Sequence, residues 1–333
     1  MCSARREERS MEFRQMQYFL CLAEEKNVTR AARQLNIVQP ALSMQIAKLE
    51  AELDQKLFER SIHGMTLTVA GETFSRLVSP IVRDVEYAKQ EMARLNGRIS
   101  GRVSVGLITS VAQSTMASSS ATVAHLYPEI TLSACEGYTE TLTDWVNSGQ
   151  LDFALINVPR RRVSLAAHHV MDEEMVFACR KDAPINPPAN LRFVDLADFD
   201  LVMPSKRHGL RMILEEHAAA AGIELKPRLE LDTLPAVCDV IATTNLVTVL
   251  PTIALQQSLA DGRVKAHRFA EPRIARSIAW VHHPRRTVSA AAKAVLDIIC
   301  NDLVEAAASA SNYMQPASSA APRRRKVPRI KSR

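Results

Sequence analysis

The chain has 333 residues, which is enough for two or three domains. Apolar residues make up 47% of it and charged residues 23%, as in ordinary water-soluble proteins. No apolar run reaches the roughly 18 residues of a membrane span, and the charged first residues do not resemble a secretory signal, so we expect a cytoplasmic protein. The six cysteines form no CxxC pair, and we expect them to be reduced.

The net charge of +6 does not by itself identify a nucleic-acid-binding region. Seven basic residues and no acidic ones lie between Pro316 and Arg333, so the rest of the chain carries about −1. Residues 307–333 are rich in Ala and Ser and then basic, which predicts a disordered basic tail. This tail either adds non-specific DNA affinity or has no role in binding.

Residues 13–58 carry apolar side chains at helical spacing. A short second helix is expected to begin after Asn27 as its N-cap, and a third at Pro40, which suits a first helical position. Residues 57–68 are expected to form two short strands and a tight turn, with an irregular loop as the alternative. Three helices and this wing predict a winged helix-turn-helix over residues 11–69.

The start of the third helix carries residue types that can bind DNA bases. A helix fits the major groove, where Gln can contact adenine and Pro or Met can touch a thymine methyl group. Polar residues of the second helix and the wing are placed to contact phosphate. The predicted DNA-binding residues are Thr29, Arg30, Gln39, Pro40, Ser43, Met44, Gln45, Lys48, Arg60 and His63. A generic three-helix domain would show the same core spacing, so periodicity alone leaves that alternative open.

A single long helix is predicted over residues 70–98. Its apolar residues recur at alternating gaps of four and three, which is the a/d pattern of a coiled coil. This stripe suits a dimer seam or packing along another helix. Pro80 lies off the stripe and removes one backbone hydrogen bond, at a cost of roughly 3 kcal/mol. The stripe consists of Phe74, Val78, Ile81, Val85, Ala88, Met92 and Leu95.

Residues 101–306 alternate between short strands and helices. This alternation predicts an α/β domain with mainly parallel sheets, in two lobes with a cleft between them. The expected strands are residues 102–108, 130–134, 152–156, 175–179, 201–204, 228–231 and 247–250, and the last expected helix is 290–304.

Residues 11–72 resemble the DNA-binding region of LysR-type transcriptional regulators. The resemblance continues more loosely to Val304, and the first stretch is also similar to the nitrogen-assimilation-control subgroup. The matching stretches keep their order and spacing without gaps. They are Phe19-Leu20, residues 29–35 (TRAARQL), residues 39–43 (QPALS), Gln45-Ile46, Leu49-Glu50, residues 57–60 (LFER), residues 67–71 (LTVAG), residues 127–130 (YPEI), residues 149–154 (GQLDFA) and Leu250-Pro251.

This resemblance implies an N-terminal winged helix-turn-helix, a long linker and dimerisation helix, and a C-terminal two-lobed periplasmic-binding-protein-like effector domain. It implies a DNA-binding transcriptional regulator whose binding or activation is modulated by a small molecule. The expected partners are a pseudo-palindromic double-stranded operator, a small carboxylate as effector, and further copies of the chain in a homodimer or homotetramer. No cofactor is expected.

Two positions in the DNA-binding region depart from the family pattern. Val38 stands where relatives commonly have Ser or Thr as the cap of the recognition helix, a loss of roughly 1 kcal/mol if uncompensated. Met44 stands where relatives often have Arg, which puts one phosphate contact in doubt.

The expected effector site lies where strands lead into helices. Ligands of open α/β sheets bind beyond the carboxyl ends of the strands, and helix N-termini favour anions. In relatives, hydroxyl residues at two of these places help to bind small carboxylates. The predicted effector-binding residues are Thr109, Ser110, Tyr138, Thr139, Ser205 and His208. As the alternative, Thr109, Ser110 and Thr139 merely cap their helices.

Other classes of protein fit the sequence less well. We expect no enzyme, because GxGxxG, Walker A, HExxH and GxSxG patterns are all absent from the sequence. His168-His169 and His282-His283 lack spaced carboxylate or Cys partners, so we expect no metal site. A solute-binding protein would need export, and a DNA-architectural protein would leave the α/β domain unexplained.

Overall fold

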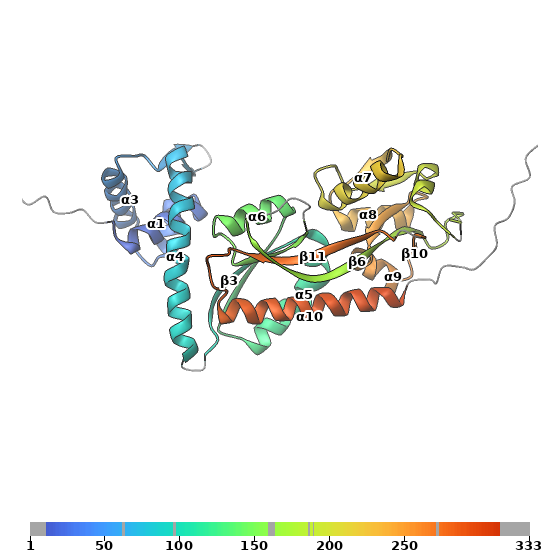
Figure 1. Ribbon diagram of the computed structural model, residues 1–333. Coiled ribbons are helices and arrows are strands. Elements are labelled where there is room, and N and C mark those ends of the chain that lie inside the picture. The colour runs from blue at the N-terminus through green and yellow to red at the C-terminus, as the bar shows by residue number, and fades with distance from the viewer. Residues whose placement is uncertain are drawn as a thin grey trace, which may run out of the picture.

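The computed structural model describes residues 11–61, 64–95, 98–158, 164–185, 187–188, 190–270 and 273–313. A helical N-terminal unit, the long helix α4 (Val69–Leu95) and a larger α/β domain follow one another along the molecule (Figure 1). None of the helices in these ranges is long and apolar enough to cross a membrane.

The N-terminal unit has the predicted helices and wing. It consists of α1 (Phe13–Glu25), α2 (Val28–Gln34), α3 (Gln39–Leu53) and the antiparallel strands β1 (Phe58–Ser61) and β2 (Gly64–Leu67). Phe19 is fully buried, and its ring lies 5.1 Å from that of Phe58 and 4.9 Å from that of Phe74. These three rings therefore join α1, the wing and α4 in one core.

The caps of α2 and α3 agree with the sequence analysis. The Asn27 side chain accepts the N–H of Arg30, as expected of an N-cap. Helix α3 begins at Gln39, so Pro40 is its second residue and not its first. Val38 is the N-cap, and it forms no side-chain hydrogen bond with the helix.

The predicted seam of α4 is wrong at its first two positions. Phe74 and Val78 are buried in the core of the N-terminal unit, because the start of α4 packs against α1. Further along, Ile81, Met92 and Leu95 are exposed, the last two at 63% and 72%. Only the later part of the stripe is therefore free to contact another helix.

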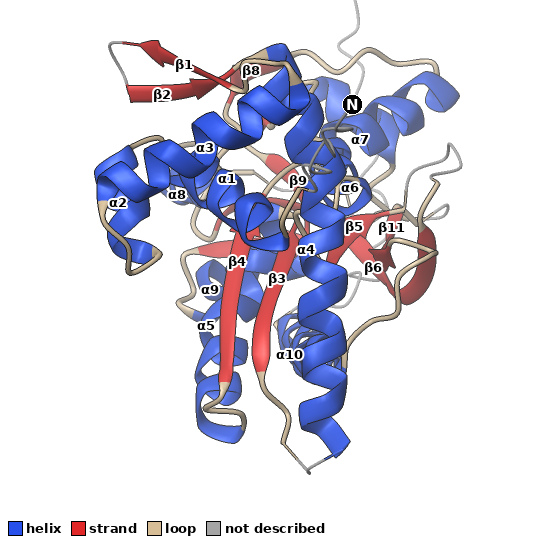
Figure 2. Ribbon diagram, turned by 90° about the vertical axis from the view of Figure 1, so that its left-hand side faces the viewer, coloured by secondary structure: helices blue, strands red, loops and turns tan. Residues whose placement is uncertain are grey.

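The first lobe of the α/β domain is built on three parallel strands. These are β3 (Gly101–Leu107), β4 (Ile130–Glu136) and β5 (Phe153–Asn157), with β3 in the middle (Figure 2). The lobe also contains α5 (Thr109–Leu126) and α6 (Thr139–Asn147), and α10 (Ala290–Asn312) packs against α5. Their buried faces form one continuous apolar core.

The second lobe has its own apolar core. Its strands β7 (Leu201–Met203) and β8 (Pro227–Glu230) are parallel. Its other elements are the 3₁₀ helix η1 (Phe193–Asp198), helices α7 (Gly209–Ala221), α8 (Leu234–Thr243) and α9 (Thr252–Ala260), and strands β9 (Thr248–Pro251) and β10 (Val264–His267).

One long strand, β6 (Ala166–Arg180), belongs to both lobes. Its first part pairs with β11 (Ala275–His282), which also pairs with β5 of the first lobe. Its last part pairs with β9 and β10 of the second lobe. The connection between the lobes is therefore a shared strand, visible along the middle of Figure 1.

The expectation of mainly parallel sheets is wrong. Among the described residues, four of the seven strand pairings in the α/β domain are antiparallel. The sequence analysis missed β10, β11, α9 and the first part of β6. Residues 166–172 (AAHHVMD) and 275–282 (ARSIAWVH) interrupt their apolar residues with Ala, His and Arg, so the sequence shows no clean alternation of apolar and polar residues.

The predicted disordered tail begins too early. Helix α10 continues to Asn312, and Ala306, Ala307 and Ala310 are buried against the domain. Their small side chains at helical spacing allow close packing, so residues 307–312 belong to the fold. The remaining residues of the tail from 314 onward lie outside the described residues.

Candidate DNA-binding and effector sites

The outer face of α3 presents most of the predicted base-contacting residues. Gln39, Pro40 and Ser43 are exposed, and Met44 is 64% exposed. Gln45 is half-buried, and its Oε1 accepts a hydrogen bond of 3.3 Å from Gln15 of α1. The first turn of α3 is therefore exposed and accessible to DNA. Gln45, further along, forms a hydrogen bond that links α3 to α1.

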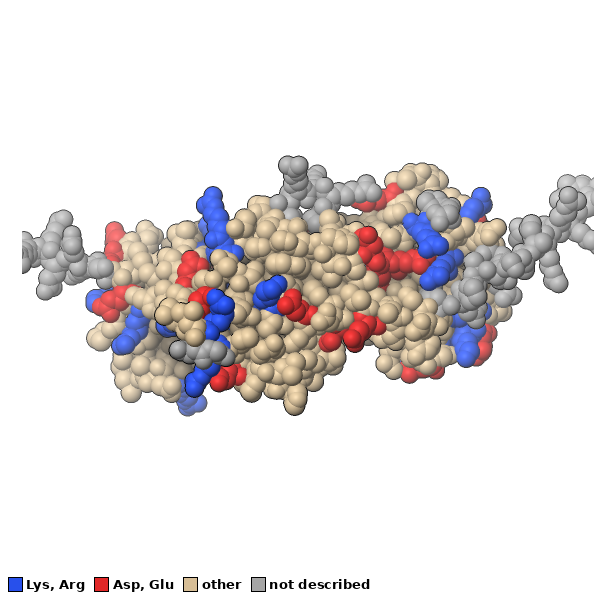
Figure 3. Space-filling model, turned by 60° about the horizontal axis from the view of Figure 1, so that its bottom comes forward, with Lys and Arg blue, Asp and Glu red and all other residues tan. Residues whose placement is uncertain are grey.

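The predicted phosphate-contacting residues lie around this face. Thr29, Arg30, Lys48 and Arg60 are all exposed, and His63 lies outside the described residues. Two of the cations have acidic neighbours: Arg30 binds Glu25 of α1 at 3.0 Å, and Lys48 lies 3.5 Å from Glu12. Basic and acidic side chains alternate over the face of the molecule in Figure 3, so charge alone does not mark the site there.

Glu50 anchors the wing, a role that the sequence analysis missed. Its Oε1 accepts the N–H groups of Leu57 and Phe58 at 2.9 and 3.2 Å, and its Oε2 lies 2.6 Å from Lys56 Nζ. Burial opposes ionisation of Glu50, but these donors more than compensate and lower its pKa. The wing is therefore fixed to the end of α3 by a buried carboxylate.

In the α/β domain, two of the predicted sites lie at helix N-termini of the first lobe. Helices α5 and α6 begin at Thr109 and Thr139, after the N-cap residues Ile108 and Tyr138. Neither N-cap forms a side-chain cap hydrogen bond. The hydroxyl of Thr139 is buried and has no hydrogen-bond partner. Capping therefore does not account for these hydroxyl residues, although it was the simpler interpretation of the sequence.

His208 occupies the corresponding position in the second lobe, at the start of α7. Its Nδ1 accepts the N–H of Leu210 at 3.2 Å, so its ring proton is on Nε2. That Nε2 is buried and has no partner. Burial lowers the pKa of His208 to about 4, an effect that nearby Arg276 reinforces and Asp232 opposes. His208 is thus a neutral hydrogen-bond donor at pH 7.

Tyr138 connects the two lobes. Its hydroxyl donates a 3.0 Å hydrogen bond to Asp232, which follows β8 in the second lobe. The same carboxylate accepts the N–H of Ser205 at 2.8 Å. Burial raises the pKa of Asp232, but the hydrogen bonds from Ser205 and Tyr138 outweigh it, and the net pKa is lowered. Through Asp232, the Tyr138 hydroxyl of the first lobe and the Ser205 N–H of the second are therefore held on opposite walls of the cleft.

A cavity of about 370 Å³ opens between these walls. Thr109, Tyr138 and Asp232 line it, together with Gln113, Glu136, Gly137, Thr233 and Pro235. Gly209 shows that the lobes meet deeper in the cleft: an added Cβ would lie 2.9 Å from Asn157 Nδ2 and 3.9 Å from Thr139 Oγ1. The start of α7 therefore lies directly against the first lobe.

A fully buried ion pair lies between the lobes, and the sequence analysis missed it. Both Nε and Nη2 of Arg276 donate to Glu173, at 2.9 and 2.6 Å. Arg276 Nη1 donates to Asn157 Oδ1 at 3.2 Å, and Glu173 also accepts from Thr252 and Ile253 at the start of α9. This network fixes Asn157 beside the cleft and joins both lobes.

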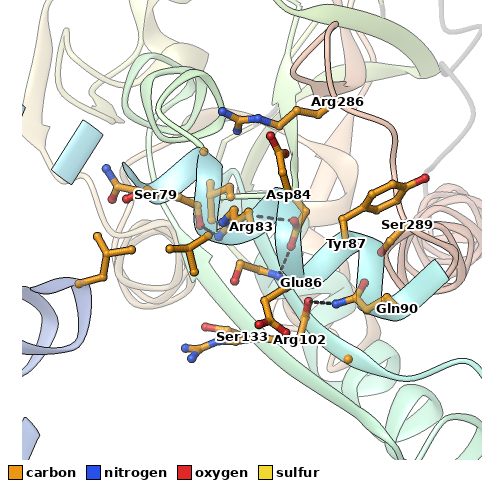
Figure 4. A pocket seen from close by; sticks show the side chains of 18 of the residues that line it. Ser79, Arg83, Asp84, Glu86, Tyr87, Gln90, Arg102, Ser133, Arg286 and Ser289 are labelled. Carbon is orange, nitrogen blue, oxygen red and sulfur yellow. Dashed lines mark hydrogen bonds and ion pairs between the residues drawn. The ribbon is translucent and has the colours of Figure 1, made fainter. Parts of the chain in front are cut away.

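A second, larger cavity lies between the α/β domain on one side and the N-terminal unit with α4 on the other. It measures about 1000 Å³, and Arg83, Tyr87 and Gln90 of α4 line it (Figure 4). Across it, Arg83 Nη1 lies 3.0 Å from Asp152 Oδ1, and Asp152 Oδ2 accepts the N–H of Ser104 at 2.7 Å. Helix α4 is therefore joined to the β3–β5 region by an ion pair.

Comparison with known proteins identifies both parts of the chain. Residues 13–72 match the family "Bacterial regulatory helix-turn-helix protein, lysR family". Residues 96–302, more than half of the chain, match the LysR substrate binding domain. The chain belongs to the LysR family. This LysR-family protein is a DNA-binding transcriptional regulator with an effector-binding domain, as the sequence analysis predicted.

Relatives of this LysR-family protein span most of its length. The nitrogen assimilation regulatory protein nac of Klebsiella aerogenes is 27% identical over 290 residues, covering 87% of this chain and 94% of the relative. The dual regulator OxyR of Escherichia coli is 26% identical over 274 residues, covering 82% and 90%. These relatives are regulators and not enzymes by name.

Solved structures share the fold of this LysR-family protein. A full-length OxyR variant from Pseudomonas aeruginosa has a TM-score of 0.70 at 22% identity, covering 88% of this chain and 95% of that one. CbnR in complex with its target DNA has a TM-score of 0.60 at 19% identity, covering 89% and 100%. The two-lobed effector domain is thus confirmed.

Proposed function

We propose that this regulator reads its operator with the first turn of α3 and responds to a small carboxylate bound between the lobes. The observation that carries the effector proposal is that each lobe has a buried donor without a partner, Thr139 Oγ1 in the first and His208 Nε2 in the second, and that Ser205 Oγ of the second lobe is also without one. A ligand that satisfies both donors stabilises the closed arrangement of the lobes.

The base-reading part of the proposal rests on exposure. Gln39 and Ser43 lie one helical turn apart on the outer face of α3, and Met44 extends from the same end. An exposed helix end of this kind fits the major groove, where amide and hydroxyl groups contact base edges. Thr29, Lys48 and Arg60 then surround it as phosphate contacts.

The first prediction concerns specific DNA binding. Gln39→Ala combined with Ser43→Ala should weaken binding to the protein's own upstream intergenic DNA by about tenfold to a hundredfold, because base contacts are lost. Binding to a scrambled fragment should not change. A fluorescence-anisotropy titration at two salt concentrations measures both. The control is Gln55→Ala, which alters an exposed glutamine beyond the other end of α3. Unchanged operator affinity in the double variant would contradict the proposed recognition helix.

The proposed effector site favours an anion. Helices α5, α6 and α7 begin at residues 109, 139 and 209 around the cleft, and helix N-termini attract negative charge. The neutral His208 donates from Nε2, and the Thr139 hydroxyl faces the same region near Gly209. Ser110, buried at the second position of α5, completes the set of hydroxyl donors.

The outer cavity restricts the class of carboxylate. Glu136 and Asp232 both line it, so a second carboxylate on the ligand would meet like charge there. A monocarboxylate, or an amino acid whose ammonium group faces these acids, fits the arrangement better than a dicarboxylate. Asp232 stays ionised because Ser205 and Tyr138 hydrogen-bond to it.

The second prediction concerns effector binding. Thr139→Val removes the unpaired hydroxyl and keeps the shape, so the affinity for the carboxylate should fall by at least about tenfold. A thermal-shift screen of monocarboxylates, dicarboxylates and amino acids identifies the ligand class, and calorimetry then gives the affinities. Thr131→Val, at an exposed position of β4, is the control. Equal affinity in Thr139→Val and the parent would place the effector elsewhere.

Peroxide sensing, a function suggested by the relatives named "Hydrogen peroxide-inducible genes activator", has weaker support here. Peroxide reacts with thiolates, and thiolates form where the pKa of a cysteine is lowered. Among the described cysteines, burial is the largest influence on the pKa and raises it in every case, namely for Cys21, Cys135, Cys179, Cys238 and Cys300. No thiol in this set has a lowered pKa, which argues against peroxide sensing through these cysteines.

The later part of α4 is the proposed contact with a second copy of the chain. Ile81, Met92 and Leu95 are exposed apolar residues on the later part of this helix. Two such sets of residues would bury each other in a homodimer and place two recognition helices on a pseudo-palindromic operator.

A further inference from the structure

The pairing of β6 with β11 brings together two histidines that are far apart in the sequence. His168 lies directly across from Trp280 in this antiparallel pair, and His282 lies two residues further along the same strand. The Nε2 atoms of His168 and His282 are 3.3 Å apart. The sequence analysis expected no metal site here, because it treated each histidine pair separately.

Both imidazole rings lie on the indole ring of Trp280. The ring centroid of His168 is 4.3 Å from that of Trp280, with 14° between the planes, and that of His282 is 4.9 Å away at 21°. The planes of the two imidazoles are nearly parallel to each other, at 11°, and their centroids are 5.4 Å apart. Stacking on the indole thus restricts the rotation of both rings and keeps their Nε2 atoms close together.

The hydrogen bonds of His282 leave a lone pair on its Nε2. Its Nδ1 lies 3.1 Å from the backbone oxygen of His283, so Nδ1 carries the proton and donates it. Metal-binding histidines commonly use their other ring nitrogen in this way.

We propose that His168 and His282 bind one divalent late transition-metal ion, such as Zn²⁺, Ni²⁺ or Cu²⁺, through their Nε2 atoms. Imidazole nitrogens suit these ions, with metal–nitrogen distances of about 2.0–2.1 Å. In a tetrahedral site, such distances separate two ligand nitrogens by about 3.3–3.4 Å, and the two Nε2 atoms already stand at 3.3 Å. His168 moves its ring proton from Nε2 to Nδ1 when the ion binds.

The remaining coordination positions belong to water. Within the described residues, no group of three or more His, Cys, Asp and Glu side chains is arranged to hold a metal ion. His168 is exposed and His282 half-buried, so water reaches the site. A site with two protein ligands and open positions exchanges its ion with the surroundings and does not serve as a structural metal. The alternative is a plain hydrogen bond from His168 to His282.

The experiment uses Trp280 as the reporter. The chain has two tryptophans, so Trp145→Phe leaves Trp280 as the single tryptophan. The untagged full-length Trp145→Phe protein is titrated with CuCl₂, and fluorescence is recorded because Cu²⁺ quenches a nearby indole. Calorimetry of the parent protein with ZnCl₂ gives the stoichiometry independently of that substitution. MgCl₂ serves as the ion control, because Mg²⁺ prefers oxygen ligands.

We expect quenching by Cu²⁺ and binding of about one Zn²⁺ per chain, with no response to Mg²⁺. His168→Gln or His282→Gln should each weaken binding by at least about tenfold. His169→Gln should not change it, because His169 is next to the site in sequence and pairs with Asp172 instead. Circular dichroism and the thermal midpoint show whether each variant is folded. Absence of Zn²⁺ binding, or equal Zn²⁺ affinity in the folded His168→Gln, His282→Gln double variant, would overturn the proposal.

Discussion

Two buried glutamates, one in each half of the protein, are held in different ways. Glu50 of the DNA-binding unit has all its partners within residues 56–58, and one of them is the exposed Lys56. Glu173 of the effector domain is paired with Arg276, whose side chain is fully buried, and with residues 252 and 253 at the start of α9. The first network is local in sequence, and the second joins three distant segments.

This difference predicts how each half of the protein responds to the loss of its buried network. A local network forms as soon as its own segment folds, and its loss should affect mainly that segment. A network between distant segments forms only when the whole domain assembles, and an unpaired buried charge left behind is costly. The DNA-binding unit should therefore tolerate the loss of Glu50 better than the effector domain tolerates the loss of Arg276.

The largest expected effect is on the buried pair. Arg276→Ala leaves Glu173 buried without its counter-charge, so the free energy of unfolding should fall by about 3–5 kcal/mol. Urea denaturation followed by circular dichroism measures it. Arg228→Ala, which breaks an exposed ion pair with Asp200, should change stability little. If the two variants lost equal stability, the comparison between buried and exposed pairs would fail.

A smaller effect is expected at Glu50. Glu50→Gln should destabilise the DNA-binding unit by about 1–2 kcal/mol at pH 7, because hydrogen bonds to a charged acceptor are weakened. The folded pKa of Glu50 lies below the unfolded value of about 4.3, so its stabilisation is present above that pH and is lost on acidification through the folded pKa. The difference in stability between Glu50→Gln and the parent should therefore become smaller as the pH is lowered.

Hydrogen exchange of the Leu57 and Phe58 amides, which donate to Glu50, measures this local opening. Glu59→Gln, at an exposed position of β1, serves as the control and should exchange like the parent. Faster exchange throughout the effector domain of Glu50→Gln would show that the two halves are not energetically separate.

The smallest effect concerns the start of the recognition helix. Val38 is 69% exposed at the N-cap of α3 and makes no cap hydrogen bond. Val38→Ser should supply that bond and raise stability by about 0.5–1 kcal/mol, measured as an increase in the thermal midpoint of the DNA-binding unit. Val38→Ala should give no such gain. A lower midpoint for the Ser variant would mean that Val38 stabilises the turn in another way.

The difference between local interactions and interactions of distant segments also determines which features could be predicted from the sequence. The cap at Asn27, the wing and, to within one residue, the start of α3 at Pro40 were predictable because caps, helix starts and tight turns depend on neighbouring residues. Thr139 and His208 could be expected at the cleft from the strand-to-helix pattern, but their unpaired atoms could not. Glu173 and Arg276 are 103 residues apart in the sequence, and the residues around each of them do not indicate which residue it pairs with.

Strand β6 has a mechanical consequence for regulation. Because its first part is hydrogen-bonded to β11 and its last part to β9 and β10, the lobes cannot slide past each other along the strand without breaking one of these ladders. A slip by one residue would also turn every side chain of the strand to the opposite face of the sheet. The low-energy motion that remains is torsion about the strand near Glu174 and Met175, where its partners change. An effector signal in this domain should therefore travel as rotation of one lobe against the other, with no change of strand register.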